Sequence, residues 1–228
     1  MDPYGKALKE FVDHNESPPL LLHNSYGAAE EMPIWYFFRA YDEMPDLEKM
    51  ALSVCEGNVL DIGAGTGCHA ICLQQMGYEV TAIDTSAAAV EIMSASQVTD
   101  ARVADYFEMT DSQFDTLICL MNGIGFIGKK DRLKDFLSQA DKLLKPEGQI
   151  ILDSSDIKYL YEGEALPIDK YFGEVSFQYE FKGQKGEWFD WVYFDKDTLA
   201  IEADALGWYV YFLHSDENGQ YLARLIRK

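Results

Sequence analysis

Three glycines and one acid lie where a predicted strand passes into a predicted helix. The segment Asp61–Gly67 reads DIGAGTG, so Asp61 stands two residues before the first glycine. Glycines in such a turn let the backbone bend sharply and approach a ligand closely, where any Cβ would intrude. A carboxylate at this point repels a pyrophosphate group and attracts an ammonium group.

Two well-known glycine loops do not fit this spacing. The dinucleotide fingerprint G-x-G-x-x-G needs a small residue three positions after its second glycine. That position is Cys68 here, and the third glycine comes one residue earlier, at Gly67. A phosphate-binding loop of the Walker type also fails, because no Lys-Ser or Lys-Thr pair follows. A nicotinamide-dependent oxidoreductase is therefore disfavoured, although it stays open as an alternative.

An acid followed by G-x-G-x-G resembles the first motif of the class I, Rossmann-like, S-adenosylmethionine-dependent methyltransferases. Later segments extend the resemblance, which covers about residues 55–155. Asp84 ends the second predicted strand, where the family places an acid on the ribose hydroxyls of the cofactor. Asp105 follows the third strand, where the family's acid meets the adenine amino group. The segment Lys145–Gly148 (KPEG) resembles the family's helix-ending L-K-P-G-G turn, with Glu147 in place of the first glycine.

The resemblance implies a set of site residues and S-adenosyl-L-methionine as the cofactor. The expected cofactor contacts are Asp61, Gly63, Ala64, Gly65, Asp84, Thr85, Asp105, Tyr106, Leu120 and Met121. At the small-molecule acceptor we expect Asn122, next to the transferable methyl group, and Tyr36. No catalytic base is identifiable and no metal site is predicted. A non-catalytic protein that binds S-adenosylmethionine or S-adenosylhomocysteine therefore remains an alternative.

The chemistry of that cofactor agrees with the residues. A ribose diol, an adenine amino group and an ammonium group can each donate hydrogen bonds to one of three carboxylates at successive strand ends. Ligands of such sheets bind at the carboxyl ends of the strands, where the strand order reverses. Methyl transfer is an in-line displacement, so the protein mainly aligns the acceptor and excludes water.

Two polar residues near the motifs have two interpretations each. The turn at Asn122 loosely resembles that of small-amine methyltransferases, such as those acting on glycine, but departs from it after the asparagine. It lacks the Asn-Pro-Pro-Tyr or Asp-Pro-Pro-Tyr signature of enzymes that methylate nucleic-acid bases. An Asn-Gly turn is also ordinary loop chemistry. His69, in the first turn of the following helix, would contact the cofactor carboxylate or serve in packing.

Strand-like and helix-like segments alternate through the middle of the chain, which is typical of a parallel sheet with crossover helices. The pattern predicts strands at 58–62, 79–83, 101–103, 114–121 and 149–153, and helices at 66–76, 86–96 and 131–144. A helix at 197–206 and a last strand pair at 207–213 and 221–226 follow, joined by the turn Ser215–Gly219 (SDENG). Strands joined so tightly must run antiparallel.

Two regions do not follow that alternation. Residues 1–54 contain proline breaks and the aromatic run Trp35–Phe38 (WYFF), and we expect a helical N-terminal cap. Residues 171–195 alternate around the turn Lys182–Gly186 (KGQKG), which predicts an inserted β-hairpin. We therefore expect an α/β fold with a doubly wound, seven-stranded, mostly parallel sheet and an antiparallel last strand. Residues 55–228 would form this Rossmann-like domain, with the hairpin and the cap over the acceptor.

Composition restricts the class of partner. The 228 residues include 48% hydrophobic and 25% charged residues, which is typical of a globular protein. A net charge of −20 repels phosphate backbones and anionic lipid, so we expect neither nucleic acid nor a membrane as partner. The start of the chain shows no signal peptide, and the four cysteines form no CxxC pair. We expect a reduced, cytoplasmic protein, and the sequence gives no indication of its oligomeric state.

Overall fold

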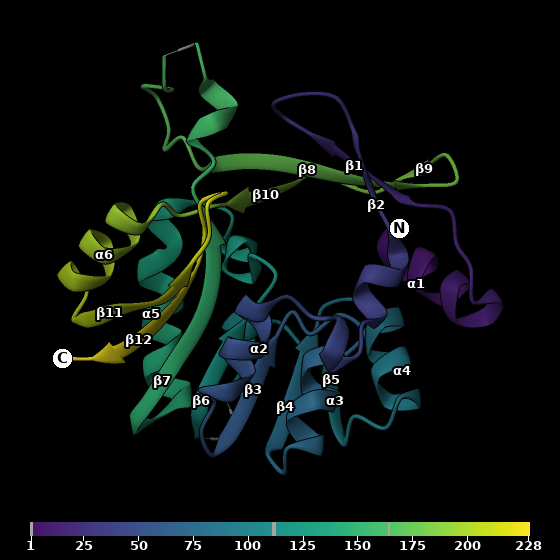
Figure 1. Ribbon diagram of the computed structural model, residues 1–228, viewed down its shortest axis with the longest axis horizontal. Coiled ribbons are helices and arrows are strands. Elements are labelled where there is room, and N and C mark those ends of the chain that lie inside the picture. Colours follow the sequence, from purple (N-terminus) through teal and green to yellow (C-terminus); the bar gives the residue numbers. More distant parts are fainter. Residues whose placement is uncertain (1, 111–112, 164) are drawn as a thin grey trace.

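The computed structural model describes residues 2–110, 113–163 and 165–228, and its larger sheet has seven strands (Figure 1). Their order is β11-β12-β7-β6-β3-β4-β5. The strands are β3 (Asn58–Ile62), β4 (Glu79–Asp84), β5 (Asp100–Val103), β6 (Phe114–Cys119), β7 (Leu144–Ser155), β11 (Trp208–Ser215) and β12 (Gln220–Arg227). Pairs among β3 to β7 are parallel, whereas β12 runs antiparallel to both β7 and β11. The predicted seven-stranded sheet with an antiparallel last strand is confirmed.

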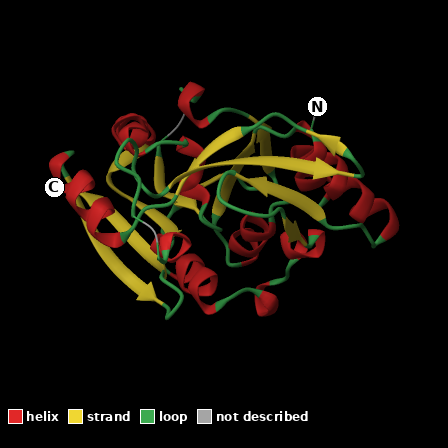
Figure 2. Ribbon diagram, turned by 90° about the horizontal axis from the view of Figure 1, so that it is seen from above, coloured by secondary structure: helices red, strands yellow, loops and turns green. Residues whose placement is uncertain are grey.

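Helices cover both faces of this sheet (Figures 1 and 2). The α-helices are α1 (Pro3–His14), α2 (Asp46–Ser53), α3 (Cys68–Gln75), α4 (Ala87–Ala95), α5 (Leu133–Leu143) and α6 (Lys196–Ala205). One core cluster takes Phe136 from α5 and Leu199 from α6. A second cluster takes Leu52 from α2, Leu73 from α3 and Met93 from α4. The sheet is therefore doubly wound, as predicted.

Six short 3₁₀ helices connect these elements within the described residues. They are η1 (Ile34–Phe38), η2 (Tyr41–Glu43), η3 (Tyr106–Glu108), η4 (Gly123–Ile127), η5 (Lys130–Arg132) and η6 (Lys158–Tyr161).

The central strands explain where a ligand site forms. In β6 five of six residues are buried, and in β3 four of five, because helices cover both faces. The chain leaves β3 for β4 on one side and later returns to β6 on the other, so the strand order reverses between them. At such a reversal the loops diverge and leave a crevice at the carboxyl ends of the strands.

A second sheet lies above those strand ends, drawn at the top of Figure 1. Its strands are β1 (Leu20–Asn24), β2 (Glu30–Met32), β8 (Glu174–Phe181), β9 (Gln184–Lys185) and β10 (Phe189–Val192). The order is β10-β8-β1-β2, and β9 pairs with β8. All pairs are antiparallel, and β8 with β10 forms the hairpin that the sequence predicted. The return strand is shorter than predicted and begins at Phe189.

The structure corrects one part of the expected cap. Residues 20–24 and 30–32 form strands, so the first 54 residues are not only helical. The burial of β1 alternates, with Leu20 and Leu22 inside, which is the pattern of a half-buried strand. This strand pairs with the edge of β8, about 155 residues away in the chain, so that Leu22 faces Tyr179 in the register. No local pattern indicates a partner for this segment, because that partner lies in the distant hairpin.

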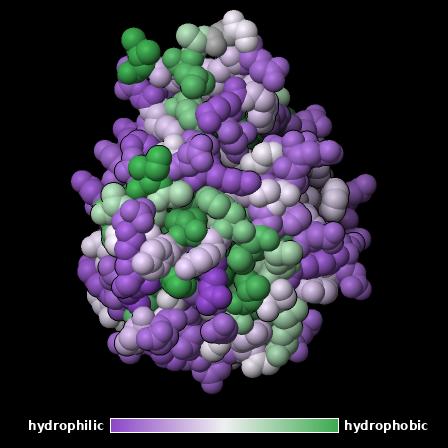
Figure 3. Space-filling model, turned by 60° about the vertical axis from the view of Figure 1, so that its left-hand side comes forward, coloured by the Kyte–Doolittle hydropathy of each residue, from purple (hydrophilic) through white to green (hydrophobic). Residues whose placement is uncertain are grey.

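Between β7 and β8 the chain forms an excursion that projects from the molecule, at the top of Figure 1. It carries the exposed residues Tyr159, Leu166 and Ile168, and apolar residues are visible at the top of Figure 3.

Among the described helices, none has both the length and the hydropathy that a membrane span requires.

Candidate active site

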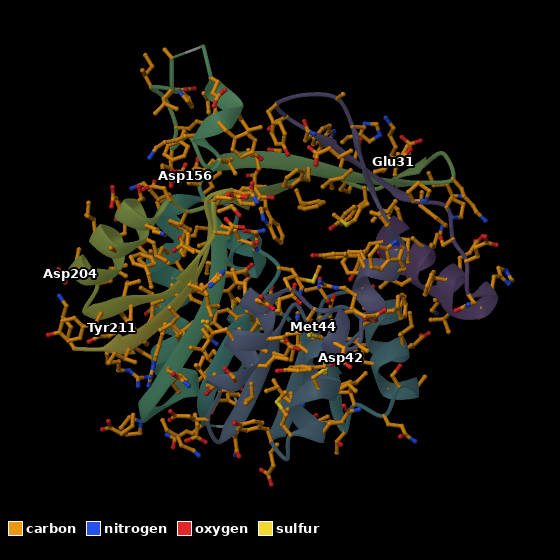
Figure 4. All side chains as sticks on the ribbon, in the orientation of Figure 1. Glu31, Asp42, Met44, Asp156, Asp204 and Tyr211 are labelled. Carbon is orange, nitrogen blue, oxygen red and sulfur yellow. The ribbon has the colours of Figure 1, made fainter. Side chains whose placement is uncertain are left out.

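A pocket of about 1120 Å³ lies between the carboxyl ends of the larger sheet and the second sheet. Figure 4 shows side chains of both sheets bordering this space. Every residue predicted from the resemblance to hold a cofactor lines it, namely Asp61, Gly63, Ala64, Gly65, Asp84, Thr85, Asp105, Tyr106, Leu120 and Met121. Tyr36 lines it as well. The volume exceeds the range of about 300–1,000 Å³ that is typical for one small ligand.

The glycine loop forms the floor of the pocket. Gly63 and Gly65 both have left-handed backbone angles, with φ of 71° and 59°. A Cβ at Gly63 would meet no atom within 4 Å and would project into open space. A Cβ at Gly65 would lie 2.8 Å from Oη of Tyr4, a residue of α1. The loop therefore keeps bare backbone against the pocket, as expected for a surface that a ligand approaches closely.

Asp61 is the last residue but one of β3, directly before this loop, and is only 2% exposed. Its Oδ2 atom has no hydrogen-bond partner among the described residues. Burial raises the pKa of Asp61 to about 6, and the nearby carboxylate of Asp84 adds to this, while His69 opposes it. A buried acceptor oxygen without a partner is costly unless a donor reaches it. The ammonium group of S-adenosylmethionine fits that requirement.

Asp84 joins the glycine loop to the end of β4. Its Oδ2 accepts a 2.9 Å hydrogen bond from the amide of Gly65, and its Oδ1 accepts one of 2.8 Å from the amide of Ser86. Burial raises the pKa of Asp84 above its usual range. A carboxylate has about four lone-pair sites, and the amides of Gly65, Ser86 and Thr85 all donate toward this one, so at least one site remains for a hydroxyl donor.

Asp105 and Tyr106 face the pocket differently. Oδ1 of Asp105 accepts a 2.9 Å hydrogen bond from the amide of Phe107 and caps η3. The ring of Tyr106 lines the pocket, but its hydroxyl points into the core and donates a 3.0 Å hydrogen bond to the carbonyl of Phe136. Its ring packs edge-on against Phe107 and Phe126.

The structure places Asn122 behind the pocket wall rather than in it. Met121 and Gly123 line the pocket, whereas Asn122 is not among the described lining residues. Both Met121 and Asn122 have left-handed angles, with φ of 62° and 57°, which turn the asparagine inward. The backbone amide of Asn122 donates a 2.8 Å hydrogen bond to Oδ1 of Asp153. Its side-chain Oδ1 accepts a 2.8 Å hydrogen bond from Oγ of Ser155.

A buried ionic cluster beside the pocket was not found from the sequence. One guanidinium nitrogen of Arg39 donates to both oxygens of Glu48 at 2.9 Å, and Nε2 of His69 lies 2.8 Å from Oε2 of Glu48. Arg39 also lies 3.6 Å from the ring centroid of Tyr36. The sequence signal for this cluster is weak: Arg39 follows the aromatic run Trp35–Phe38, but no spacing pattern indicates that it contacts Glu48.

Neighbouring groups outweigh burial in setting the pKa values of His69 and Glu48. Burial by itself would lower the pKa of His69, but Cys68 and Glu48 beside it outweigh that effect and raise the pKa. For Glu48, burial is likewise outweighed by His69 and Arg39, so its pKa is lowered. His69 lines the pocket, and Nη1 of Arg39 has no partner among the described residues. The cluster therefore holds positive charge next to the unpartnered oxygen of Asp61.

The N-terminal residues close one side of the pocket. Asp2, Pro3, Tyr4 and Phe37 line it together with the glycine loop. Oδ1 of Asp2 accepts a 2.7 Å hydrogen bond from the amide of Gly5 and caps α1, while its Oδ2 accepts one of 2.5 Å from Oγ of Ser86. The start of α1 is thus attached to the loop that follows β4.

Comparison with known proteins agrees with this geometry. The family model described as a methyltransferase domain matches residues 59–148. A putative methyltransferase, YqeM, of Bacillus subtilis is 32% identical over 104 residues, which are 43% of this chain and 42% of that protein. A glycine/sarcosine N-methyltransferase of Aphanothece halophytica is 27% identical over 152 residues, which are 55% of this chain and 56% of that protein. The chain thus matches about half the length of these curated relatives.

A solved structure matches almost the whole chain. The S-adenosylmethionine-dependent methyltransferase of Bacteroides fragilis, crystallised with S-adenosyl-L-homocysteine, is 38% identical with a TM-score of 0.91. The match covers 99% of this chain and 94% of that one. The sugar N-methyltransferase KedS8 of a Streptoalloteichus species shares the fold, with a TM-score of 0.59 at 16% identity. The pocket, its glycine loop and this match over the full length together show that the chain belongs to the class I S-adenosylmethionine-dependent methyltransferases.

Proposed function

We propose that this chain binds S-adenosylmethionine on the glycine loop and methylates a small molecule held beneath the second sheet. The observation that carries the proposal is the unpartnered Oδ2 of Asp61, buried beneath a loop whose glycines leave backbone open to the pocket. The pocket of about 1120 Å³ leaves room for a second molecule beside the cofactor. The bound S-adenosylhomocysteine of the Bacteroides fragilis protein supports the same choice of cofactor.

The chain's own residues divide the work of binding. Asp61 would accept from the ligand ammonium, Asp84 from ribose hydroxyls and Asp105 from the adenine amino group. The positive charge of His69, which lines the pocket, suits the ligand carboxylate. Bound S-adenosylmethionine would supply an activated methyl group on a sulfonium. The protein then holds the acceptor in line with that methyl group and keeps water away, with Leu120 and Met121 forming apolar surface beside it.

Charge and cysteine chemistry support the proposed kind of partner and location. A net charge of −20 supports a small acceptor over a nucleic acid. Cys55, Cys68, Cys72 and Cys119 are all free and buried, which supports a reducing, cytoplasmic environment.

Calorimetry and turnover together test this function. We expect S-adenosylmethionine and S-adenosylhomocysteine to bind the wild-type chain and NAD to show no binding. Asp61→Asn should weaken both ligands, whereas Glu79→Gln, an exposed change at the amino end of β4, should leave them unchanged. Formation of S-adenosylhomocysteine with an acceptor present would establish an enzyme. Binding of NAD with no binding of S-adenosylmethionine would overturn the assignment, and binding without turnover on any acceptor would favour the non-catalytic alternative.

A further inference from the structure

The second sheet gives the pocket an aromatic wall. Phe177 and Tyr179 come from β8, Phe189 and Trp191 from β10, and Tyr193 follows β10. The rings form a contiguous set, with centroids 5.1 Å apart for Tyr179 and Phe189, and 6.1 Å apart for both Phe177–Phe189 and Phe189–Trp191. An apolar, ring-sized body fits such a surface, and aromatic faces also attract cations.

Carboxylates surround this wall. Glu30, Glu31, Glu187 and Asp190 all line the pocket on the side of the second sheet, and Figure 4 labels Glu31 there. Among the described lining residues, Arg132 is the only lysine or arginine, and its guanidinium lies 4.4 Å from the ring centroid of Phe107. His69, the other cationic side chain of the described lining, belongs to the glycine-loop side, and a surface with mainly negative charge concentrates cationic ligands. An acceptor bearing phosphate or carboxylate would be repelled here.

Glu30 is the carboxylate that the fold positions most firmly. Its Oε1 accepts hydrogen bonds from Nδ2 of Asn24 at 3.1 Å and from Oη of Tyr26 at 3.0 Å. Asn24 is buried, and its Oδ1 accepts from the amides of Tyr26 and Gly27, which fixes the turn between β1 and β2. In the described residues every hydrogen bond of Glu30 is made by Oε1, so Oε2 is left for a ligand.

The surroundings of Glu30 connect it to the aromatic wall. Tyr26, which donates to it, packs edge-on against Phe177 with centroids 6.2 Å apart. Tyr193 and Glu30 both line the pocket, and the pKa of Tyr193 is raised, first by burial and next by the negative charge of Glu30. A preset carboxylate next to aromatic faces is an arrangement that binds an ammonium group by a charge-assisted hydrogen bond and cation–π contact.

We propose that the methyl acceptor is a primary or secondary amine on an apolar, ring-sized body, with Glu30 as the residue that binds its ammonium group. This inference rests on the proposed methyltransferase function and specifies its substrate class. A neutral alcohol or phenol would fit the aromatic wall but would form no charge-assisted hydrogen bond with the exposed carboxylate of Glu30. A carboxylate would in addition meet like charge.

The reaction balances with these groups. The bound ammonium first loses one proton to the Glu30 carboxylate, from which it passes to water at the open side of the pocket. The amine nitrogen then uses its lone pair to form the new C–N bond. The methyl–sulfur bond breaks and its electron pair stays on sulfur as a neutral thioether. The products are an N-methylammonium ion, S-adenosylhomocysteine and the released proton.

Three probes with one phenyl body test the substrate class: phenethylamine, 2-phenylethanol and 3-phenylpropionate. Each is titrated by calorimetry into the full chain saturated with S-adenosylhomocysteine at pH 7.5. We expect the amine to bind at least tenfold more tightly than the alcohol and the carboxylate to bind most weakly. Equal affinities, a tighter carboxylate or no binding of the amine would overturn the inference.

Substitution of Glu30 separates its role from that of the cofactor site. Glu30→Gln should lower the affinity for phenethylamine about tenfold and leave that for 2-phenylethanol unchanged, and Glu79→Gln should change neither. An unchanged amine affinity in Glu30→Gln would remove Glu30 from the site. With S-adenosylmethionine, tyramine should be methylated on nitrogen, and methylation on its phenol oxygen would contradict the amine class. If S-adenosylhomocysteine does not bind to the wild-type chain, the proposed function itself is overturned.

Discussion

The amide of Gly65 donates a 2.9 Å hydrogen bond to Oδ2 of Asp84, so the glycine loop and the end of β4 form one unit. Asp84 thereby has two tasks, because it fixes the loop and presents free lone pairs to the pocket. We expect Asp84→Ala to weaken S-adenosylmethionine binding by ~1.5–3 kcal/mol, the range for hydrogen bonds to charged groups. Calorimetry measures this, with Glu79→Gln as the control. An affinity within twofold of wild type would show that Asp84 does not contact the ligand.

Gly65 tests whether the loop is the cofactor cradle. Its φ of 59° is strained for any residue with a β-branched side chain, and its Cβ would lie 2.8 Å from Oη of Tyr4. We expect Gly65→Val to abolish cofactor binding while circular dichroism still shows a folded chain. Gly77 also has a left-handed angle, with φ of 93°, but a Cβ there meets nothing within 4 Å. Gly77→Val should therefore lose stability and keep its affinity; loss of affinity in both variants would point to general unfolding.

The raised pKa of Asp61, about 6, predicts two pH effects. Ligand affinity should fall as the pH drops through about 6, because a protonated carboxyl no longer attracts an ammonium group, and Asp61→Asn should show a flatter profile. The stability of the ligand-free chain has the opposite pH dependence, because the contribution of Asp61 to stability falls as the pH rises. The folded state holds the proton more tightly than the unfolded state, whose pKa is about 3.9, so this residue destabilises the fold progressively as the pH rises from about 4 to 6.

Chemical denaturation of Asp61→Asn checks that sign. Relative to wild type, the variant should gain about 2–3 kcal/mol more stability at pH 8 than at pH 4, since one pKa unit corresponds to about 1.4 kcal/mol. A gain that is the same at both pH values would show that the carboxyl of Asp61 titrates normally in the folded chain.

The buried cluster of Arg39, Glu48 and His69 predicts that one near-isosteric substitution lowers the free energy of unfolding strongly. Glu48→Gln removes the negative charge between two buried cations, and breaking a buried pair costs about 3–5 kcal/mol. Urea unfolding should show this loss. Glu91→Gln breaks the exposed pair with Lys9 and should cost less than about 1 kcal/mol. Similar losses in the two variants would contradict the interpretation of the cluster as a buried charge network.

The position of Tyr4 over the glycine loop predicts that the N-terminal segment responds to ligand. Amides within residues 10–45 should gain protection from hydrogen exchange when S-adenosylmethionine or its product binds, together with Gly63–Gly67 and Asp84. Protection confined to the loops, with the first 45 residues indifferent to ligand, would show that the cap has only a structural role.

Local sequence patterns predict the larger sheet and the floor of the pocket. Alternation of apolar runs with amphipathic segments identified β3 to β7 in order, because a buried parallel strand and a crossover helix each impose a local pattern. The glycine spacing after Asp61 is local as well, since the turn must be made by adjacent residues. The predicted strands at 58–62 and 79–83 agree with β3 and β4 to within one residue.

The wall opposite that floor depends on long-range contacts that form only in the folded chain. The strand β1 pairs with β8, about 155 residues further along the chain, and this pairing brings Glu30 to the same pocket as Asp61. Glu48 meets Arg39 and His69 through packing of three separate elements. Asn122 turns inward to Ser155 with a left-handed backbone angle that asparagine adopts more readily than most residues. Such contacts join residues far apart in the chain, and no local pattern encodes a partner that only the folded arrangement of elements supplies.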